Sequence, residues 1–291
     1  STIMRTGSIS ITNARTGTSA SVSVSTSSSN RALSTTGRCA DASGDSGAMK
    51  DEYGVMDDSG ETFSLDHFTL ESGETLKDVQ VRYRAFGRLN DARDNVIVVC
   101  HALTGNAQLD QWWGTMLGPG KVMDTDKYLV VCANVLGGCY GTTGPQSINP
   151  DTGRPYGMDF PDVTIRDSVK LHHRMLLDGV GAHSVRAVIG GSMGGMQALE
   201  WVVEGKSYVR SAVIIGCGAA HSAWQIAISE TQRQAIYADP AWKGGYYLPE
   251  EPPRAGLAVA RQIAMVSYRT ASGYARKFGR RREKEGAGAG A

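Results

Sequence analysis

Hydrophobic and polar positions in the first part of the folded region predict strands. Two short segments, 63–70 and 79–86, alternate apolar and polar residues on either side of a polar turn and are predicted to pair as an antiparallel hairpin. Continuous runs rich in β-branched residues follow at 95–100 and 128–133. Such runs are typical of strands that are buried on both faces of a parallel sheet.

The pattern then alternates between helical and strand periods. Its predicted elements are a helix over 163–179 ending at Asp178-Gly179, a strand over 185–189, a helix over 193–204 and a strand over 209–215. Beyond Gly216 we expect two helices, 222–237 and 254–269, and no further strand. Alternating strands and helices predict an α/β fold, with a mostly parallel sheet and right-handed crossovers.

Residues 1–40 differ in composition from this region. Nineteen of them are Ser or Thr and none is acidic, so the segment has too little apolar surface to pack. Organellar transit peptides share this composition, which leaves open a mitochondrial or plastid location as well as a cytoplasmic one. We expect a tail and linker over 1–60, a folded domain over 61–280 and a low-complexity tail over 281–291.

Charge and cysteine content exclude several classes of protein. Thirty Lys and Arg against 29 Asp and Glu give a net charge of +1, which excludes a strongly basic nucleic-acid binder. Five cysteines without a C-x-x-C spacing argue against a disulfide scaffold or a zinc site and favour a reducing compartment. No apolar run approaches the roughly 18 residues that cross a bilayer. We therefore expect no metal site and neither nucleic-acid nor membrane partners.

A glycine-rich junction carries the strongest chemical signal. The sequence GGSMGG at 190–195 lies between a predicted strand and a predicted helix, which is the setting of a G-x-S-x-G nucleophile elbow. A Cβ at Gly190 or Gly194 should collide with the neighbouring strand or helix, whereas the side chain of Ser192 should be exposed. A glycine-rich turn that allows close packing or cradles a phosphate is the alternative. The helix that begins at Met193 directs its N–H groups and positive dipole end to the same place.

A second hydrogen-bond donor is expected from the loop after an earlier strand. The sequence CHALTGN at 100–106 has that position, so the backbone N–H of Leu103 is predicted to pair with that of Met193 around a developing oxyanion. An ordinary turn closed by Gly105 is the alternative. Neither segment contains a dinucleotide-binding G-x-G-x-x-G after the first parallel strand.

Several longer motifs resemble the homoserine O-acetyltransferases, in unbroken order from about residue 63 to 280. These motifs are HALTGN at 101–106, GPG at 118–120, NVLGGCYGTTGP at 134–145, GGSMGGMQALEW at 190–201, HSAWQI at 221–226 and QRQAI at 232–236. The resemblance implies an α/β-hydrolase fold with a helical lid and an acetyltransferase of methionine biosynthesis.

The same resemblance implies roles for individual residues and ligands. Ser192 would carry the acetyl group, Leu103 and Met193 would donate backbone N–H groups, and Arg233 would contact the substrate carboxylate. A guanidinium fork matches a carboxylate, although a solvated Arg on a helix is the alternative. The substrates would be acetyl-CoA, as co-substrate, and L-homoserine, with no other cofactor and with a homodimer left open.

The sequence departs from the family pattern after the serine. In α/β-hydrolases the catalytic acid and base follow the nucleophile, on loops after later strands. Here the only later histidine is His221, which lies in the HSAWQI motif and does not match the base, and Asp239 does not match the acid. Of the earlier histidines, His101 is expected near the oxyanion loop. The others are expected on the surface: His67, His172, His173 and His183. We therefore expect a C-terminally truncated member, with no triad acid or base among its residues and with its last strands missing.

Other functions stay open at this point. The chain could be a catalytically silent remnant, a serine or homoserine O-succinyltransferase of the same fold, or an unrelated esterase. The esterase is disfavoured because hydrolysis does not require the motifs at 134–145 and 232–236.

Overall fold

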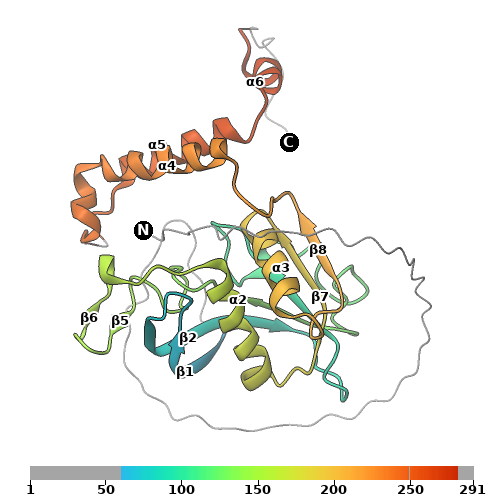
Figure 1. Ribbon diagram of the computed structural model, residues 1–291. Coiled ribbons are helices and arrows are strands. Elements are labelled where there is room, and N and C mark those ends of the chain that lie inside the picture. Colours follow the sequence, from blue (N-terminus) through green and yellow to red (C-terminus); the bar gives the residue numbers. More distant parts are fainter. Residues whose placement is uncertain (1–59, 249, 281–291) are drawn as a thin grey trace. The chain divides into compact units, whose positions relative to one another are not determined.

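A six-stranded sheet organises the part of the chain that the computed structural model describes, residues 60–248 and 250–280 (Figure 1). Its strands, in spatial order, are β1 Glu61–Thr69, β2 Thr75–Phe86, β4 Leu129–Ala133, β3 Val96–Cys100, β7 Val185–Gly191 and β8 Ala212–Ile215. The β1–β2 and β2–β4 pairs are antiparallel, whereas β4–β3, β3–β7 and β7–β8 are parallel. The hairpin start and the parallel sheet expected from the sequence are confirmed.

Helices and short elements connect and extend these strands. They are α1 Leu109–Trp112, α2 Ile165–Arg174, η2 Met175–Val180, α3 Met193–Glu204, α4 Ala223–Tyr237, η3 Pro240–Gly245, α5 Arg254–Ser267 and α6 Ala271–Phe278, with a small β5–β6 hairpin (Ile148–Asn149 and Arg154–Pro155) followed by η1 Gly157–Asp159. Within the described parts of the chain, no helix combines the length and apolar character that crossing a membrane requires.

The alternation of side chains along β3 divides the core into two clusters. Val96, Val98 and Cys100 belong to the larger cluster, which includes Trp201 of α3 and buried residues of α2. Ile97 and Val99 belong to the smaller one, with residues of α1 and the following segment. Because successive side chains of a strand point to opposite faces, both faces of β3 are buried, as its continuous apolar run predicted.

The helix expected over 163–179 has a different end. Thr164 caps α2 in a capping box with Asp167, whose side chain accepts a hydrogen bond from the Thr164 amide at 2.9 Å. Past Arg174 the helix widens into the π-helical turn η2. Gly181 ends it in the left-handed conformation, with φ 77°. The helix therefore ends at Val180, one residue beyond the predicted end, and Gly181 rather than Gly179 follows its last residue.

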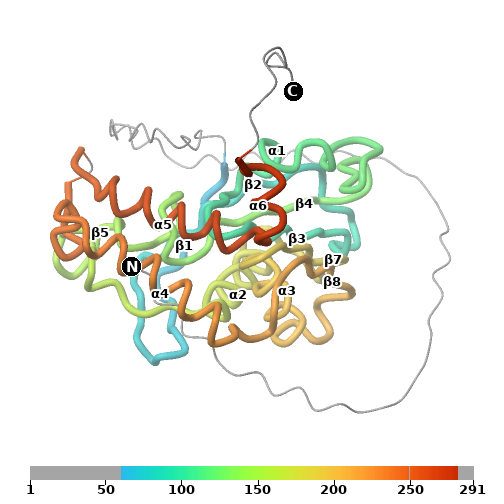
Figure 2. The backbone as a smooth tube through the Cα atoms, turned by 90° about the horizontal axis from the view of Figure 1, so that it is seen from above, coloured from blue at the N-terminus to red at the C-terminus, as the bar shows by residue number. Residues whose placement is uncertain are grey.

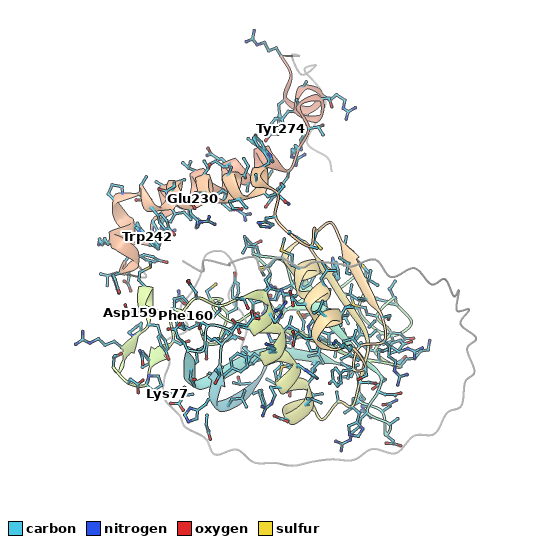
Figure 3. All side chains as sticks on the ribbon, viewed as in Figure 1. Lys77, Asp159, Phe160, Glu230, Trp242 and Tyr274 are labelled. Carbon is cyan, nitrogen blue, oxygen red and sulfur yellow. The ribbon has the colours of Figure 1, made fainter. Side chains whose placement is uncertain are left out.

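The helices α4 and α5 lie side by side (Figure 2). Asp239, which follows α4, accepts hydrogen bonds from the amides of Ala241 at 2.9 Å and Gly256 at 2.8 Å. Trp242 of η3, labelled in Figure 3, has its ring between those of Tyr237 and Tyr247. These contacts join the two helices at one end.

The tail and linker expected over 1–60 lie outside the described residues except for Gly60, and so does the tail over 281–291.

The strand β8 forms one edge of the sheet and is apolar and exposed. Val213, Ile214 and Ile215 are 48%, 40% and 47% exposed, and within the described ranges β8 pairs only with β7. An open apolar edge is a template for pairing with another chain.

We therefore expect Ile214→Lys to reduce self-association of the 291-residue chain, as measured by sedimentation velocity across a concentration series. Val202→Lys is the control, because Val202 is similarly exposed (45%) but lies on helix α3. Equal effects of both substitutions would show that general charge, not the strand edge, controls association.

Candidate active site

Ser192 occupies the turn between β7 and α3. Its backbone has φ 57° and ψ −123°, a conformation that L-residues rarely adopt. Two hydrogen bonds hold it: the Ser192 amide donates to the carbonyl of Ile215 at 3.0 Å, and its own carbonyl accepts from the Met196 amide at 3.1 Å. The residue is exposed, so its hydroxyl is available to a ligand. This is the geometry predicted for a nucleophile at a strand-to-helix elbow.

The glycines of the motif make this turn sterically feasible. A Cβ on Gly190 would overlap the carbonyl oxygen of Gly194, and a Cβ on Gly194 would overlap the carbonyl oxygen of Cys100. A Cβ on Gly195 would lie 2.7 Å from the Cys217 sulfur. The collisions expected at Gly190 and Gly194 are therefore confirmed. Close packing of β3, β7 and α3 places the serine at the carboxyl ends of the parallel strands.

A cavity of about 760 Å³ opens beside Ser192. The loop after β3, the helix α1 and the ends of β7 and β8 supply its walls. The lining residues are Cys100, Ala102, Thr104, Gly105, Asn106, Gln111, Trp112, Trp113, Gly191, Ser192, Ile215 and Gly216. None of them has a charged side chain. The cavity therefore suits an uncharged group next to the serine hydroxyl, because an unpaired charge is costly to desolvate.

The two predicted oxyanion donors, Leu103 and Met193, are sequence neighbours of residues that line this cavity. Met193 is the first residue of α3, so its N–H belongs to the amides at a helix start that have no carbonyl partner within the helix. Leu103 has a 70% exposed side chain and lies between Ala102 and Thr104, both of which line the cavity. The structure thus brings the loop and the serine to one cavity. The pairing of the Leu103 and Met193 amides around an oxyanion stays a prediction.

The structure offers no hydrogen-bonded base to Ser192. All six histidines of the chain lie in the described residues, and no described hydrogen bond joins any of them to the Ser192 hydroxyl. His101 uses both ring nitrogens, with Ala102 O at 2.8 Å and the Val135 amide at 3.3 Å. His221, which directly precedes the cap of α4, does not line the cavity.

The expectation that the other early histidines lie on the surface was wrong for His172. This residue is 3% exposed, and its Nε2 lies 3.0 Å from the carbonyl oxygen of Asn134. Burial lowers its pKa to about 4, so the ring is neutral at physiological pH. His173 is half-buried against the rings of Trp201 and Tyr208. His172 is therefore a buried residue of α2 and His173 a half-buried one, and neither lines the cavity at Ser192.

Arg233 has a partner on its own helix. Its Nε and Nη2 donate to Oε2 of Glu230 at 2.9 and 2.6 Å, on α4, where Figure 3 labels Glu230. Arg233 is not among the residues that line the cavity at Ser192. The hydrogen bonds with Glu230 fix the guanidinium on one side of the helix, and its predicted contact with a substrate carboxylate stays a prediction.

Five cavity residues lie outside the two motifs singled out from the sequence, and two of them, Ile215 and Gly216, are at the end of β8. Gln111, Trp112 and Trp113 follow the oxyanion loop, and the two indole rings lie 5.1 Å apart between centroids. The signal for them was the adjacent pair of tryptophans, because such large side chains near a catalytic loop often form a binding wall. Residues 60–248 and 250–280 contain no group of three His, Cys, Asp or Glu side chains that could hold a metal ion.

Comparison with known proteins identifies related sequences and structures. A family profile described as alpha/beta hydrolase fold matches residues 95–288. The homoserine O-acetyltransferase of Chloroherpeton thalassium is 53% identical over 212 residues, which are 73% of this chain and 56% of that protein. The homoserine O-acetyltransferase of Trichormus variabilis is 53% identical over 213 residues, 73% of this chain and 59% of its own length. The chain thus spans less than two thirds of these relatives.

Solved structures include a transferase and an esterase. The homoserine O-acetyltransferase from Bacillus anthracis is 33% identical with a TM-score of 0.70, and the match covers 75% of this chain and 62% of that one. Esterase E22 is 36% identical with a TM-score of 0.66, covering 75% and 63%. Both activities therefore occur on closely similar folds.

Proposed function

The chain belongs to the alpha/beta hydrolase fold family, and from this premise we propose that the protein transfers an acetyl group from acetyl-CoA to the hydroxyl of L-homoserine. One observation carries the proposal: Ser192 sits at the strained elbow, exposed to a cavity without charged walls. The 53% identity to homoserine O-acetyltransferases over most of the folded region supports the choice of substrates.

The reaction would proceed in two half-reactions through an acetyl-serine. In the first, Ser192 Oγ attacks the thioester carbon, negative charge develops on the carbonyl oxygen, and the C–S bond breaks to release CoA as its thiol. In the second, the homoserine hydroxyl attacks the same carbon, the bond to Ser192 Oγ breaks, and O-acetylhomoserine leaves. The amides of Leu103 and Met193 would stabilise the oxyanion in both, each with about 3 to 4 kcal/mol.

Each half-reaction also needs a group that accepts and returns the hydroxyl proton. A neutral serine hydroxyl is a poor nucleophile, so the reaction depends on a base within hydrogen-bond reach. The described residues supply none at Ser192. We propose that the base and its acid partner come from outside the described residues, and the match covers only 56% and 59% of the lengths of the two relatives.

The cavity favours acetyl over succinyl as the transferred group. A succinyl group would bring a carboxylate close to Ser192, and among the described residues no Lys, Arg or His side chain lines the cavity. Burying that carboxylate without a cation would be unfavourable. The O-succinyltransferase is therefore the weaker alternative.

Acetyl-ester hydrolysis is the second candidate, because esterase E22 is 36% identical and has the same fold. The acetyl-serine would be the same in both reactions, and water would replace homoserine in the second half. The two functions differ in whether homoserine captures the acetyl group.

The test uses a completed chimera, defined as residues 1–291 followed by the C-terminal part of the Chloroherpeton thalassium relative that lies beyond the match. We expect the chimera to release one equivalent of CoA per Ser192 from acetyl-CoA alone, to turn over repeatedly only when homoserine is present, and to form O-acetylhomoserine. The 291-residue chain alone should be slower by about 10⁴-fold or more, because none of its described residues holds a base at Ser192. Thiol release and mass spectrometry of the product measure both results.

Three outcomes would contradict parts of the proposal. Homoserine-independent CoA release with free acetate as the product would favour the esterase. Succinyl-CoA turnover in preference to acetyl-CoA would reverse the choice of donor. Full turnover by the 291-residue chain would show instead that His101, His221 or a partner subunit acts as the base.

A further inference from the structure

The loop between β3 and α1 has exposed side chains, but hydrogen bonds fix the residues at its two ends. Ala102, Leu103 and Thr104 are exposed, and the loop contributes Ala102, Thr104, Gly105 and Asn106 to the cavity wall. Such a loop would move freely without contacts at its two ends. His101 at the start and Ala107 at the end are both buried and both hydrogen-bonded to the segment that follows β4.

The first contact is made by the His101 ring, which is 2% exposed. A backbone amide can only donate a hydrogen bond, so the Val135 N–H donates to His101 Nε2 at 3.3 Å. Nε2 must therefore be unprotonated. The ring proton therefore lies on Nδ1, which donates to the Ala102 carbonyl at 2.8 Å. Burial lowers the pKa of His101 and keeps the ring neutral, as this double contact requires.

The second contact is made by Asn134, which is 1% exposed. Its Oδ1 accepts a hydrogen bond from the Ala107 amide at 2.8 Å, and its Nδ2 donates to the Tyr140 carbonyl at 2.6 Å. The backbone of Asn134 is itself fixed: its amide donates to Arg82 O at 2.9 Å, and its carbonyl accepts from Thr142 Oγ1 at 2.9 Å. The amide side chain thus ties the end of the loop to a rigid position on the sheet.

A third contact links the loop to the nucleophile helix. Nε2 of Gln197 on α3 donates to the His101 carbonyl at 3.3 Å. The same helix begins with Met193, directly after Ser192. The loop that carries Leu103 and the helix that starts at Met193 are therefore connected through buried hydrogen bonds.

We propose that His101 and Asn134 are positioning residues, which clamp the loop 102–106 at both ends and so keep the Leu103 amide in place for the oxyanion that forms at Ser192. The proposal rests on the acyl-serine chemistry proposed above, but not on the identity of the acceptor. An oxyanion donor is effective only in a preorganised position, and losing one costs about 10² to 10³ in kcat. The clamp acts through backbone geometry, since neither side chain lines the cavity.

The experiment measures acetylation of Ser192 in the completed chimera with p-nitrophenyl acetate, whose p-nitrophenolate leaves as the acetyl-serine forms. We expect His101→Phe to slow acetylation about 100-fold without a comparable change in KM. His101→Gln should recover most of the rate, because its side-chain oxygen can accept from the Val135 amide. Asn134→Leu should slow the reaction as His101→Phe does.

The matched control is His173→Phe. His173 is a half-buried histidine of α2 that packs against the rings of Trp201 and Tyr208 and has no described hydrogen bond to Asn134 or to the loop, so kcat should stay within about threefold. The proposal is overturned if His101→Phe acetylates at the wild-type rate, or if His173→Phe is slowed as much as His101→Phe. If the clamp variants slow acetylation as expected but the chimera transfers no acetyl group to homoserine, the clamp is supported and the proposed acceptor is refuted.

A second measurement does not depend on catalytic activity. Nitrogen-15 NMR of histidine-labelled 291-residue chain should show one ring with a fixed proton on Nδ1 and an unprotonated Nε2 across neutral pH. His101→Gln should remove that signal. A His101 ring that exchanges between tautomers, or that becomes protonated near its ordinary pKa of about 6.5, would contradict the clamp.

Discussion

Replacing Ser192 by alanine in the completed chimera is expected to reduce kcat for acetyl transfer by about 10⁴ to 10⁶-fold. The hydroxyl is the atom that would carry the acetyl group, and a methyl group cannot form that bond. Oxyanion donors and substrate binding alone leave only a small residual rate. CoA thiol release measures the loss, and intact-protein mass spectrometry should show the acetyl adduct on the wild-type chimera but not on Ser192→Ala.

The fold should tolerate this substitution, because the Ser192 side chain is exposed and the described hydrogen bonds use only its backbone. Ser72→Ala, on the exposed turn between β1 and β2, is the control and should retain full activity. A Ser192→Ala chimera that still formed the acetyl adduct would place the nucleophile on another residue.

Gly194→Ala is expected to destabilise the fold strongly, by about 3 kcal/mol or more in the free energy of unfolding. The new Cβ would overlap the carbonyl oxygen of Cys100 and approach its carbonyl carbon to 2.8 Å and the His101 carbonyl oxygen to 3.0 Å. These are backbone atoms of β3 and the oxyanion loop, so they cannot swing aside as a flexible side chain would. Urea denaturation followed by circular dichroism measures the change.

The neighbouring Gly191→Ala provides the comparison. Its Cβ would meet nothing closer than the Ile215 carbonyl oxygen at 3.8 Å, which is an ordinary contact. We expect its stability to stay within about 1 kcal/mol of the wild type. Similar losses from both substitutions would indicate a general intolerance of the strand end rather than a specific collision at Gly194.

Local sequence patterns predicted the parallel strands and the elbow well. The run that became β3 is β-branched at all but its last position, and the run that became β4 is apolar throughout and contains Val130 and Val131. Ser192 lies in a motif whose glycines leave no room for a Cβ at positions 190 and 194. In both places the signal comes from neighbouring residues along the chain. Predictions of this kind depend little on tertiary context.

Features that depend on tertiary context could not be predicted in the same way. Of the strand expected over 209–215 only Ala212–Ile215 forms. Val209 makes an isolated bridge with Val185 and lies outside the strand. The burial of His172 follows from the packing of α2 on the sheet, which a polar residue type does not reveal. The partner of Asn134 at Ala107 lies 27 residues away, a separation that no periodicity reports.

The hydrogen bond from the Ser192 amide to the Ile215 carbonyl has a consequence for motion. Ile215 ends the outermost strand β8, so the nucleophile is anchored to the edge of the sheet rather than to its centre. When an edge strand frays, its hydrogen bonds open first. The Ser192 amide should therefore exchange with deuterium at the rate of β8 opening, faster than the amides of β3, and a binding partner that paired with β8 would slow the exchange at the nucleophile.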